Sequence, residues 1–391
     1  MKHLRLFTRI LAATLLVGTV RSADPSVEER LKALEQQVQA LAKENTDLKK
    51  ELGWKDNKAP VLVQPLGKET KLIVGGFVQA QGEFGHAADP RWAGVKDRFY
   101  FRRARICVQG SFAEDFDFKA EVELGANSLS ASTGLSARPN EVYISWRKFP
   151  EAIVRFGQIK SAFGAEQLAS DTKLLAIERT LPNDRLTDGR QLGFCLNGEV
   201  LDKKVGYLVS LQNGNGINTS ANDNSKFQKA ARVYFTPLAT NDDRVVFGVN
   251  GLWTDDAGVA KSGFGFTGNL FTGERSAWGV DGLWHHGSLD LSAEWLHNTF
   301  KPAGSVEFEA DGWSATAAYY LVPGKVQGVL RHEEFDPNTG VGGNTIRSWT
   351  VGLNYLIKGE DLRLMIDYIY GEVPGSTTDG GRLLTRMQVL F

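Results

Sequence analysis

The sequence has few cysteines, almost no net charge and, beyond its N-terminus, no long apolar run. Cys107 and Cys195 are the only cysteines in 391 residues, which excludes a disulfide framework or a zinc-cysteine site. A formal net charge of −1 gives no basic footprint for nucleic acid. No run of 18 apolar residues follows the N-terminus, which excludes a transmembrane helix in the mature chain. A transmembrane β-barrel remains open, because its alternating strands average to an ordinary hydropathy.

Signatures of catalysis are also missing. No Ser–His–Asp arrangement, phosphate-binding glycine loop or HExxH zinc motif stands out in the sequence. The sequence therefore predicts no enzyme, no bound metal and no cofactor. What the chain has instead is glycine (42 residues) and aromatic residues (9 Trp, 9 Tyr and 22 Phe). This composition favours β-structure with many turns.

Residues 1–23 have the three parts of a secretory signal peptide. A basic start precedes an apolar stretch at 10–20, and small residues follow. That stretch is too short to span a membrane, so it predicts export rather than anchoring. Cleavage after Ser22 and cleavage after Ala23 both remain open.

Residues 24–53 carry a heptad pattern, and residues 54–70 form a proline-containing linker. Apolar residues and one Asn are spaced 4, 3, 4, 3 at Val27, Leu31, Leu34, Val38, Leu41, Asn45, Leu48 and Leu52. This spacing predicts a short α-helical coiled coil, in which the single Asn fixes the register. The alternative is one amphipathic helix that lies on another surface.

From residue 71 to residue 391 the period changes to 2, which predicts strands. Alternate connections are short and long, as in outer-membrane barrels, whereas a soluble sandwich has no reason to sort its loops. We expect an all-β, 16-stranded antiparallel transmembrane barrel. Segment 262–272 is assigned to a long outer loop at 254–275, and 18 strands is the alternative. The predicted strands are 71–84, 98–112, 115–125, 140–147, 152–160, 190–200, 203–212, 227–236, 244–253, 276–285, 288–298, 309–321, 325–335, 347–357, 361–370 and 383–391.

The two faces of these strands differ in chemistry. In 361–370, Leu364 and Ile366 share one face while Arg363 and Asp367 share the other. A charged face would be too costly inside a packed soluble core, but it suits a water-filled lumen. The pattern therefore predicts lipid on one side of the wall and water on the other.

Two segments resemble motifs of the phosphate-selective porins O and P. Residues 101–106 read FRRARI, and residues 157–166 read GQIKSAFGAE, followed by ERT at 178–180. The resemblance covers roughly residues 71–391. It implies a 16-stranded, usually trimeric outer-membrane channel whose third outer loop, here 161–189, folds into the pore. Some relatives add an N-terminal coiled coil, which would lie in the periplasm.

Phosphate specificity does not follow from the charges. Loop 161–189 holds three basic and five acidic residues, and the lumen-facing charges of the second to fifth strands nearly balance. The basic residues either orient charged solutes or pair with the acids of the wall, and Lys160 is a candidate for holding the loop against Glu166. The pore-lining candidates are Arg103, Arg105, Lys119, Arg147, Arg155, Lys160, Lys173, Arg179 and Arg185.

The favoured function is an outer-membrane porin for passive diffusion of small solutes and ions, with anions such as phosphate as candidates. Its expected partners are membrane lipid and two further copies of the chain. The alternative is a structural anchor that tethers the envelope through its coiled coil, in contact with the cell wall. The two functions are compatible, and conductance separates them because a plugged anchor passes little current.

Overall fold

The computed structural model describes Lys32, Gln36 and residues 71–129, 134–372 and 380–391. Apart from Lys32 and Gln36, the predicted signal peptide, coiled coil and linker lie outside these residues. No helix in the described part of the chain is long and apolar enough to cross a membrane.

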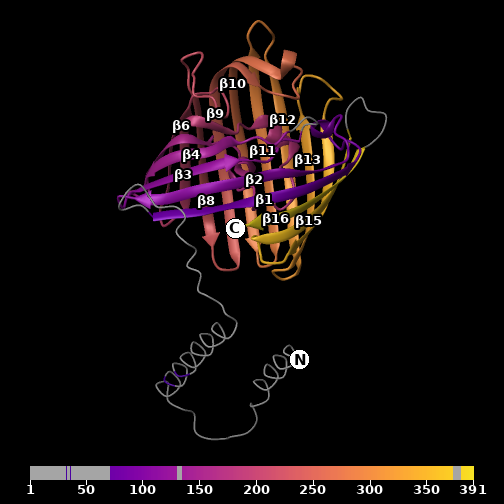
Figure 1. Ribbon diagram of the computed structural model, residues 1–391. Coiled ribbons are helices and arrows are strands. Elements are labelled where there is room, and N and C mark those ends of the chain that lie inside the picture. Colours follow the sequence, from indigo (N-terminus) through magenta and orange to yellow (C-terminus); the bar gives the residue numbers. More distant parts are fainter. Residues whose placement is uncertain (1–31, 33–35, 37–70, 130–133, 373–379) are drawn as a thin grey trace. The chain divides into compact units, whose positions relative to one another are not determined.

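Sixteen antiparallel strands form a closed barrel in which each strand pairs with its sequence neighbours and β1 pairs with β16 (Figure 1). The predicted strand number and the meander order are confirmed. The strands are β1 (Lys71–Gly85), β2 (Arg98–Phe112), β3 (Phe116–Glu123), β4 (Arg138–Trp146), β5 (Ile153–Lys160), β6 (Arg190–Val200), β7 (Val205–Gln212), β8 (Gln228–Ala239), β9 (Asp243–Ala260), β10 (Leu270–His286), β11 (Leu289–Pro302), β12 (Phe308–Val322), β13 (Val326–Asp336), β14 (Ile346–Leu356), β15 (Leu362–Glu372) and β16 (Gly380–Leu390).

The barrel closes at the last residue of the chain. Phe391 and Gly76 exchange two backbone hydrogen bonds, of 2.9 and 3.0 Å, beside the β1–β16 pairing. Closure leaves no unpaired edge, which is the condition for β-structure to span a membrane.

The predicted outer loop at 254–275 is too long. Strands β9 and β10 continue to Ala260 and Leu270, and only residues 261–269 connect them, with the short helix η2 (Thr267–Asn269) at the end. The extension follows from the alternation, because Thr254 and Asp256 are buried on the inside while the intervening residue stays partly exposed. Eighteen strands are thereby excluded.

The sides of the wall follow the predicted alternation, as β14 illustrates. Its residues are alternately buried and exposed along the whole strand. Thr350 and Asn354 are buried inside, whereas Trp349, Val351 and Tyr355 are exposed on the outside. An apolar outer band with aromatic residues suits lipid, and a polar inside suits a channel.

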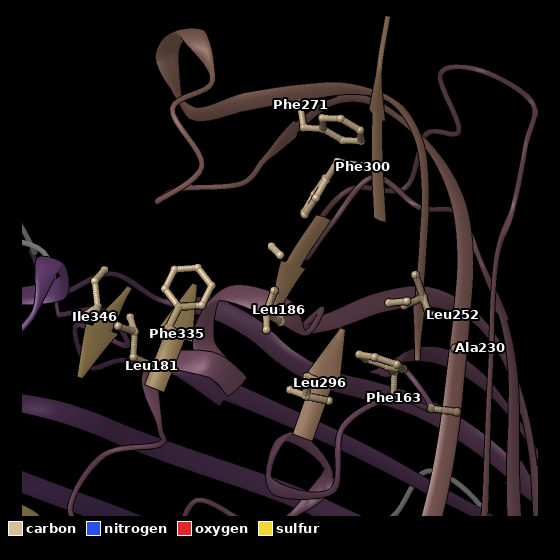
Figure 2. Packing of buried hydrophobic residues seen from close by; sticks show 13 residues of the cluster. Phe163, Leu181, Leu186, Ala230, Leu252, Phe271, Leu296, Phe300, Phe335 and Ile346 are labelled. Carbon is tan, nitrogen blue, oxygen red and sulfur yellow. The ribbon is translucent and has the colours of Figure 1, made fainter. Parts of the chain in front are cut away.

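Loop 161–189, called the inner loop below, packs inside the barrel. Its short helices α3 (Ala165–Leu168) and α4 (Leu181–Leu186) carry the chain across, and α4 contacts β11, β12 and β13. Figure 2 shows Leu181 near Phe335, and Phe163 near Leu296, within one apolar cluster. Each such side chain contributes roughly 1.5–3 kcal/mol on burial. The apolar cluster therefore fixes one side of the inner loop.

Candidate solute channel

A β-bulge in β2 places two consecutive arginines inside the lumen. Gln79 pairs with Arg103 and Ala80 pairs with Phe101, which leaves Arg102 as the extra residue of the bulge. Arg102 is 7% exposed and Arg103 3% exposed, while Phe101 is exposed on the outside. Both guanidinium groups thus point inward, although strict alternation would turn Arg102 toward lipid.

The arginines of β2 and β16 bind Glu178 of the inner loop. The Glu178 carboxylate accepts from Arg102 at 2.9 and 3.0 Å and from Arg386 at 2.5 Å, and Gln81 donates at 3.2 Å. Burial opposes ionisation of Glu178, yet Arg102 and Arg386 outweigh it and hold its pKa well below the usual range. Glu178 is therefore a carboxylate that neutralises this part of the lumen wall.

Asp171, seven residues before Glu178 in the inner loop, plays the same role. Its carboxylate lies 2.7 Å from Arg105 and 3.4 Å from Arg103, and it also pairs with Arg179. Burial again opposes ionisation, but these arginines lower the pKa of Asp171 well below its ordinary value. Because Arg103 and Arg105 share their charge with the inner loop, they brace it against the wall.

The adjoining part of the wall, on β13 and β15, holds the backbone of the same loop. Arg331 donates to the Glu178 carbonyl at 2.6 Å, and Arg363 donates to the Thr172 carbonyl at 2.9 Å. Asp367 accepts from the backbone N–H of Ile177 at 2.6 Å. These contacts satisfy backbone groups that would otherwise be buried without partners.

Both ends of the inner loop are tied as well. Near its start, Glu294 accepts from the backbone N–H of Ala165 at 2.5 Å. Near its end, Asp188 lies 2.7 Å from Arg275 and pairs with Lys261. Burial works against the charge of Asp188, but the two cations lower its pKa well below the usual range. The loop is thus fixed at both ends and along its middle.

Five basic residues line a cavity of about 350 Å³ between the inner loop and β1–β7, called the basic cavity here. Three acids share it, and each of them forms an ion pair. Arg155 and Lys160 pair with no carboxylate in the described part of the chain. Lys160 donates to carbonyls of the inner loop, whereas Arg155 lies 5.4 Å from the Tyr143 ring. Its Nε is buried and has no hydrogen-bond partner. The charged residues that line the cavity are Arg105, Lys119, Arg155, Lys160, Arg190, Glu121, Glu141 and Asp171.

A second cavity, of about 560 Å³, adjoins the first, since Leu168 and Leu208 line both. Lys173 and Arg244 line this second cavity, and both side chains are exposed. Among the residues that the structure describes, neither has a carboxylate partner. Asp281, by contrast, is paired with Arg232. Glu166 and Glu294 also line the second cavity without a cation partner in the described part of the chain, but both carboxylates accept hydrogen bonds from backbone N–H groups of the inner loop. Each cavity therefore holds a basic residue with no carboxylate partner among the described residues, Arg155 in the basic cavity and Lys173 and Arg244 in the second.

The remaining candidates serve the inner loop or lie away from the channel. Lys160 donates to the carbonyls of Leu168 and Ala169, at 3.3 and 2.7 Å. It does not hold Glu166, whose carboxylate instead accepts from the Thr180 backbone N–H and hydroxyl at 3.0 and 2.7 Å. The sequence expectation for Lys160 was right about the loop and wrong about the partner.

Three further candidates lie elsewhere along the chain. Arg179 donates to the carbonyls of Glu166 and Ala169 within the loop. Arg185 binds the hydroxyl of Ser262 in the connection between β9 and β10. Arg147 is exposed just beyond β4, in a short turn, where it pairs with Asp117 at 2.9 Å. Of the nine candidates, Arg105, Lys119, Arg155, Lys160 and Lys173 line the two cavities.

Sequence reasoning missed Arg102, Arg331 and Arg386. Nothing in the sequence signals the bulge that turns Arg102 inward. Arg331 and Arg386 do fall on the inward face by alternation, and that alternation is the signal that identifies them. All three bind the inner loop.

Comparison with known proteins agrees with this architecture. The family described as phosphate-selective porin O and P matches residues 79–265 and 254–391. Porin O of Pseudomonas aeruginosa is 25% identical over 353 residues, which are 81% of this chain and 79% of that protein. Among solved structures, an anion-selective porin from Comamonas acidovorans aligns with a TM-score of 0.59 at 12% identity, over 83% of this chain and all of that one. The outer membrane protein OmpT of Vibrio cholerae, in a trimer form, gives a TM-score of 0.55 at 12% identity, over 83% and 100% of the two chains.

The family match covers most of the chain, and the solved structures share its barrel. The closed strand order and the polar lumen crossed by an inner loop are the parts of a channel. The chain belongs to the phosphate-selective porin O and P family and is an outer-membrane channel for small solutes.

Proposed function

We propose that the channel prefers anions, phosphate among them, and that Arg155, Lys173 and Arg244 set this preference. The observation that carries the proposal is the sign of the unpaired charge in the basic cavity. Every acid that lines the basic cavity is ion-paired, whereas Arg155 has no carboxylate partner in the described part of the chain. A cation that faces a low-dielectric, narrow cavity attracts anions and repels cations.

Arginines that bind the inner loop contribute shape rather than selectivity. Arg102 and Arg386 are neutralised by Glu178, and Arg105 is neutralised by Asp171 and by Glu123 at 2.6 Å. They fix the inner loop, and the inner loop narrows the lumen to the two adjoining cavities. One structural neighbour is named an anion-selective porin, which agrees with the proposed preference for anions.

The test is the reversal potential of single channels in a planar bilayer under a KCl gradient. We expect anion selectivity in the native protein, and a shift toward zero when Arg155, Lys173 and Arg244 are changed together to Gln. Arg147→Gln is a control for the loss of one positive charge outside the cavities. An unchanged reversal potential in the triple variant would refute the assignment.

Phosphate is tested in the same bilayer. Addition of millimolar phosphate to a chloride current should reduce the current of the native channel more than that of Arg155→Gln. Equal reduction in both would mean that phosphate does not bind beside Arg155, and no reduction in either would leave a general anion channel.

We further propose that the channel is a homotrimer with an N-terminal coiled coil in the periplasm, exported by a signal peptide at 1–23. The heptad at 24–53 and the trimer form of one structural neighbour support this proposal. Native mass spectrometry of the mature protein would give the subunit count and the cleavage site. Deletion of 24–53 should weaken the trimer without removing the current. A deletion that weakens attachment to the cell wall would support the tether as an additional role.

A further inference from the structure

The outer ends of β8–β11 rise above the apolar band of the barrel. Strands β9 and β10 have 18 and 17 residues, whereas β3, β5 and β7 have 8 each. At about 3.4 Å per residue, β9 is roughly 60 Å long. A band about 25 Å tall needs only roughly 35 Å of a strand tilted by about 45°. Trp253 lies ten residues, or roughly 34 Å, from the short-turn end at which β9 begins, so its outward side chain lies near the outer edge of such a band.

A groove of about 610 Å³ lies on this part of the wall and is called the rim groove here. Its floor is one row of the sheet, in which Lys229, Trp253, Ser276 and Thr299 are successive partners on β8, β9, β10 and β11. Trp253 is 55% exposed, so its ring is free for stacking. Because β9 is opposite β1 in a ring of sixteen strands, the rim groove is far from the wall where the chain closes.

The residues of the rim groove are of mixed chemistry. Lys229 is exposed and has no ion-pair partner among the described residues. Lys301 lies 3.6 Å from Glu307, and both side chains are about half exposed. Such an exposed ion pair contributes little free energy, so Lys301 can exchange Glu307 for another anion. Glu274, Ser276 and Thr299 add oxygen atoms beside the Trp253 ring.

We propose that the rim groove binds the phosphorylated sugar headgroup of an outer-leaflet glycolipid. Lys229 and Lys301 would pair with its phosphates, since lysines near a membrane surface attract anionic headgroups. The Trp253 ring suits a sugar face, because aromatic residues concentrate at membrane interfaces. The carboxylate and hydroxyl oxygens would accept hydrogen bonds from sugar hydroxyls. A groove for a simple inorganic anion would need neither the ring nor Glu274.

The test is a titration of the full mature protein in detergent with bis-phosphorylated lipid A, followed by native mass spectrometry. We expect one tight lipid per subunit and a loss of affinity of about tenfold in Lys229→Glu/Lys301→Glu. Trp253→Ala should also weaken binding. Lipid A without its phosphates should bind the native protein as weakly as lipid A binds the double-Glu variant. Single-channel current should stay unchanged in all variants, which shows that they fold, because the groove lies outside the lumen.

Lys204→Glu/Lys325→Glu is the matched control, since both lysines are exposed in short turns at the opposite end of the barrel. Equal loss of lipid A in this control and in the rim variant would overturn the proposal, because binding would then be a general effect of charge. Full displacement of the lipid by tens of millimolar inorganic phosphate would also overturn it. So would a change in subunit count on Lys229→Glu/Lys301→Glu, which would make the groove a subunit contact.

Discussion

Glu178→Gln should release the inner loop from the arginine wall. The native carboxylate neutralises Arg102 and Arg386 and lies 3.9 Å from Arg103. Gln keeps the shape but removes the charge, so three buried guanidinium groups are left with Asp171 as the nearest acid of the loop. Breaking a buried ion pair costs about 3–5 kcal/mol. We expect the docked state of the loop to lose about that much.

The assay is single-channel conductance together with limited trypsin digestion. The variant should conduct more than the native channel, with noisier current, and trypsin should cut the loop faster. Asp184→Asn is the control within the same loop, because Asp184 is 47% exposed and its ion pair with Arg185, at 3.6 Å, is long. Such an exposed pair is worth about 0–1 kcal/mol, so conductance should not change. If Glu178→Gln conducts like the native channel and resists trypsin equally, the ion pairs do not hold the loop.

Three further predictions follow from the lumen. Cys195 is the register partner of Arg155, which has no carboxylate partner among the described residues. In a Cys107→Ser variant, a negatively charged thiosulfonate should modify Cys195 about tenfold faster than a positively charged one. An attraction of about 0.7 kcal/mol for the anion and an equal repulsion for the cation, as at ~10 Å with an effective dielectric constant of about 50, give this ratio. Equal rates would contradict it. The loop carboxylates have depressed pKa values, so the stability they give is present above their unfolded values near ~4 and is lost only as pH falls through the lower folded values. These carboxylates should therefore cause no conductance transition between pH 8 and pH 4, and a transition in this range that disappears in Glu178→Gln or Asp171→Asn would contradict their pairing. Gly312→Ala would place its Cβ 2.6 Å from the Cβ of Pro182, which should loosen α4 and speed tryptic cleavage, while Gly282→Ala, with no neighbour nearer than 3.8 Å, should leave the cleavage rate unchanged.

Alternation predicted the barrel because the wall separates two solvents. A one-residue shift in β14 would turn Asn354 to lipid and Val351 to water, so the pattern is strict wherever lipid lies outside. Above the lipid this constraint weakens. For that reason the ends of β9 and β10 were mistaken for a loop, since Asp255 faces outward there among polar surroundings.

The candidate site was harder to predict than the wall. Alternation correctly placed Arg103 and Arg105 inside, and the resemblance correctly implied that loop 161–189 enters the lumen. Neither alternation nor the resemblance shows which charged residues are unpaired, because ion pairing depends on contacts between segments that are distant in the sequence. Asp171 reaches Arg105 across 66 positions of the sequence, for example.

The balance of charge along the lumen therefore has a local meaning. Counted over the sequence, acids and bases nearly cancel, which argues against any ion preference. In space, most of that cancellation occurs where the inner loop meets the wall, around Glu178 and Asp171. Arg155, Lys173 and Arg244 line the two cavities with no carboxylate partner among the described residues. Glu166 and Glu294, which have no cation partner there, accept hydrogen bonds from the inner loop instead. A nearly neutral lumen can thus favour anions, because its acids hold the loop in place while a few of its bases remain available to the solute.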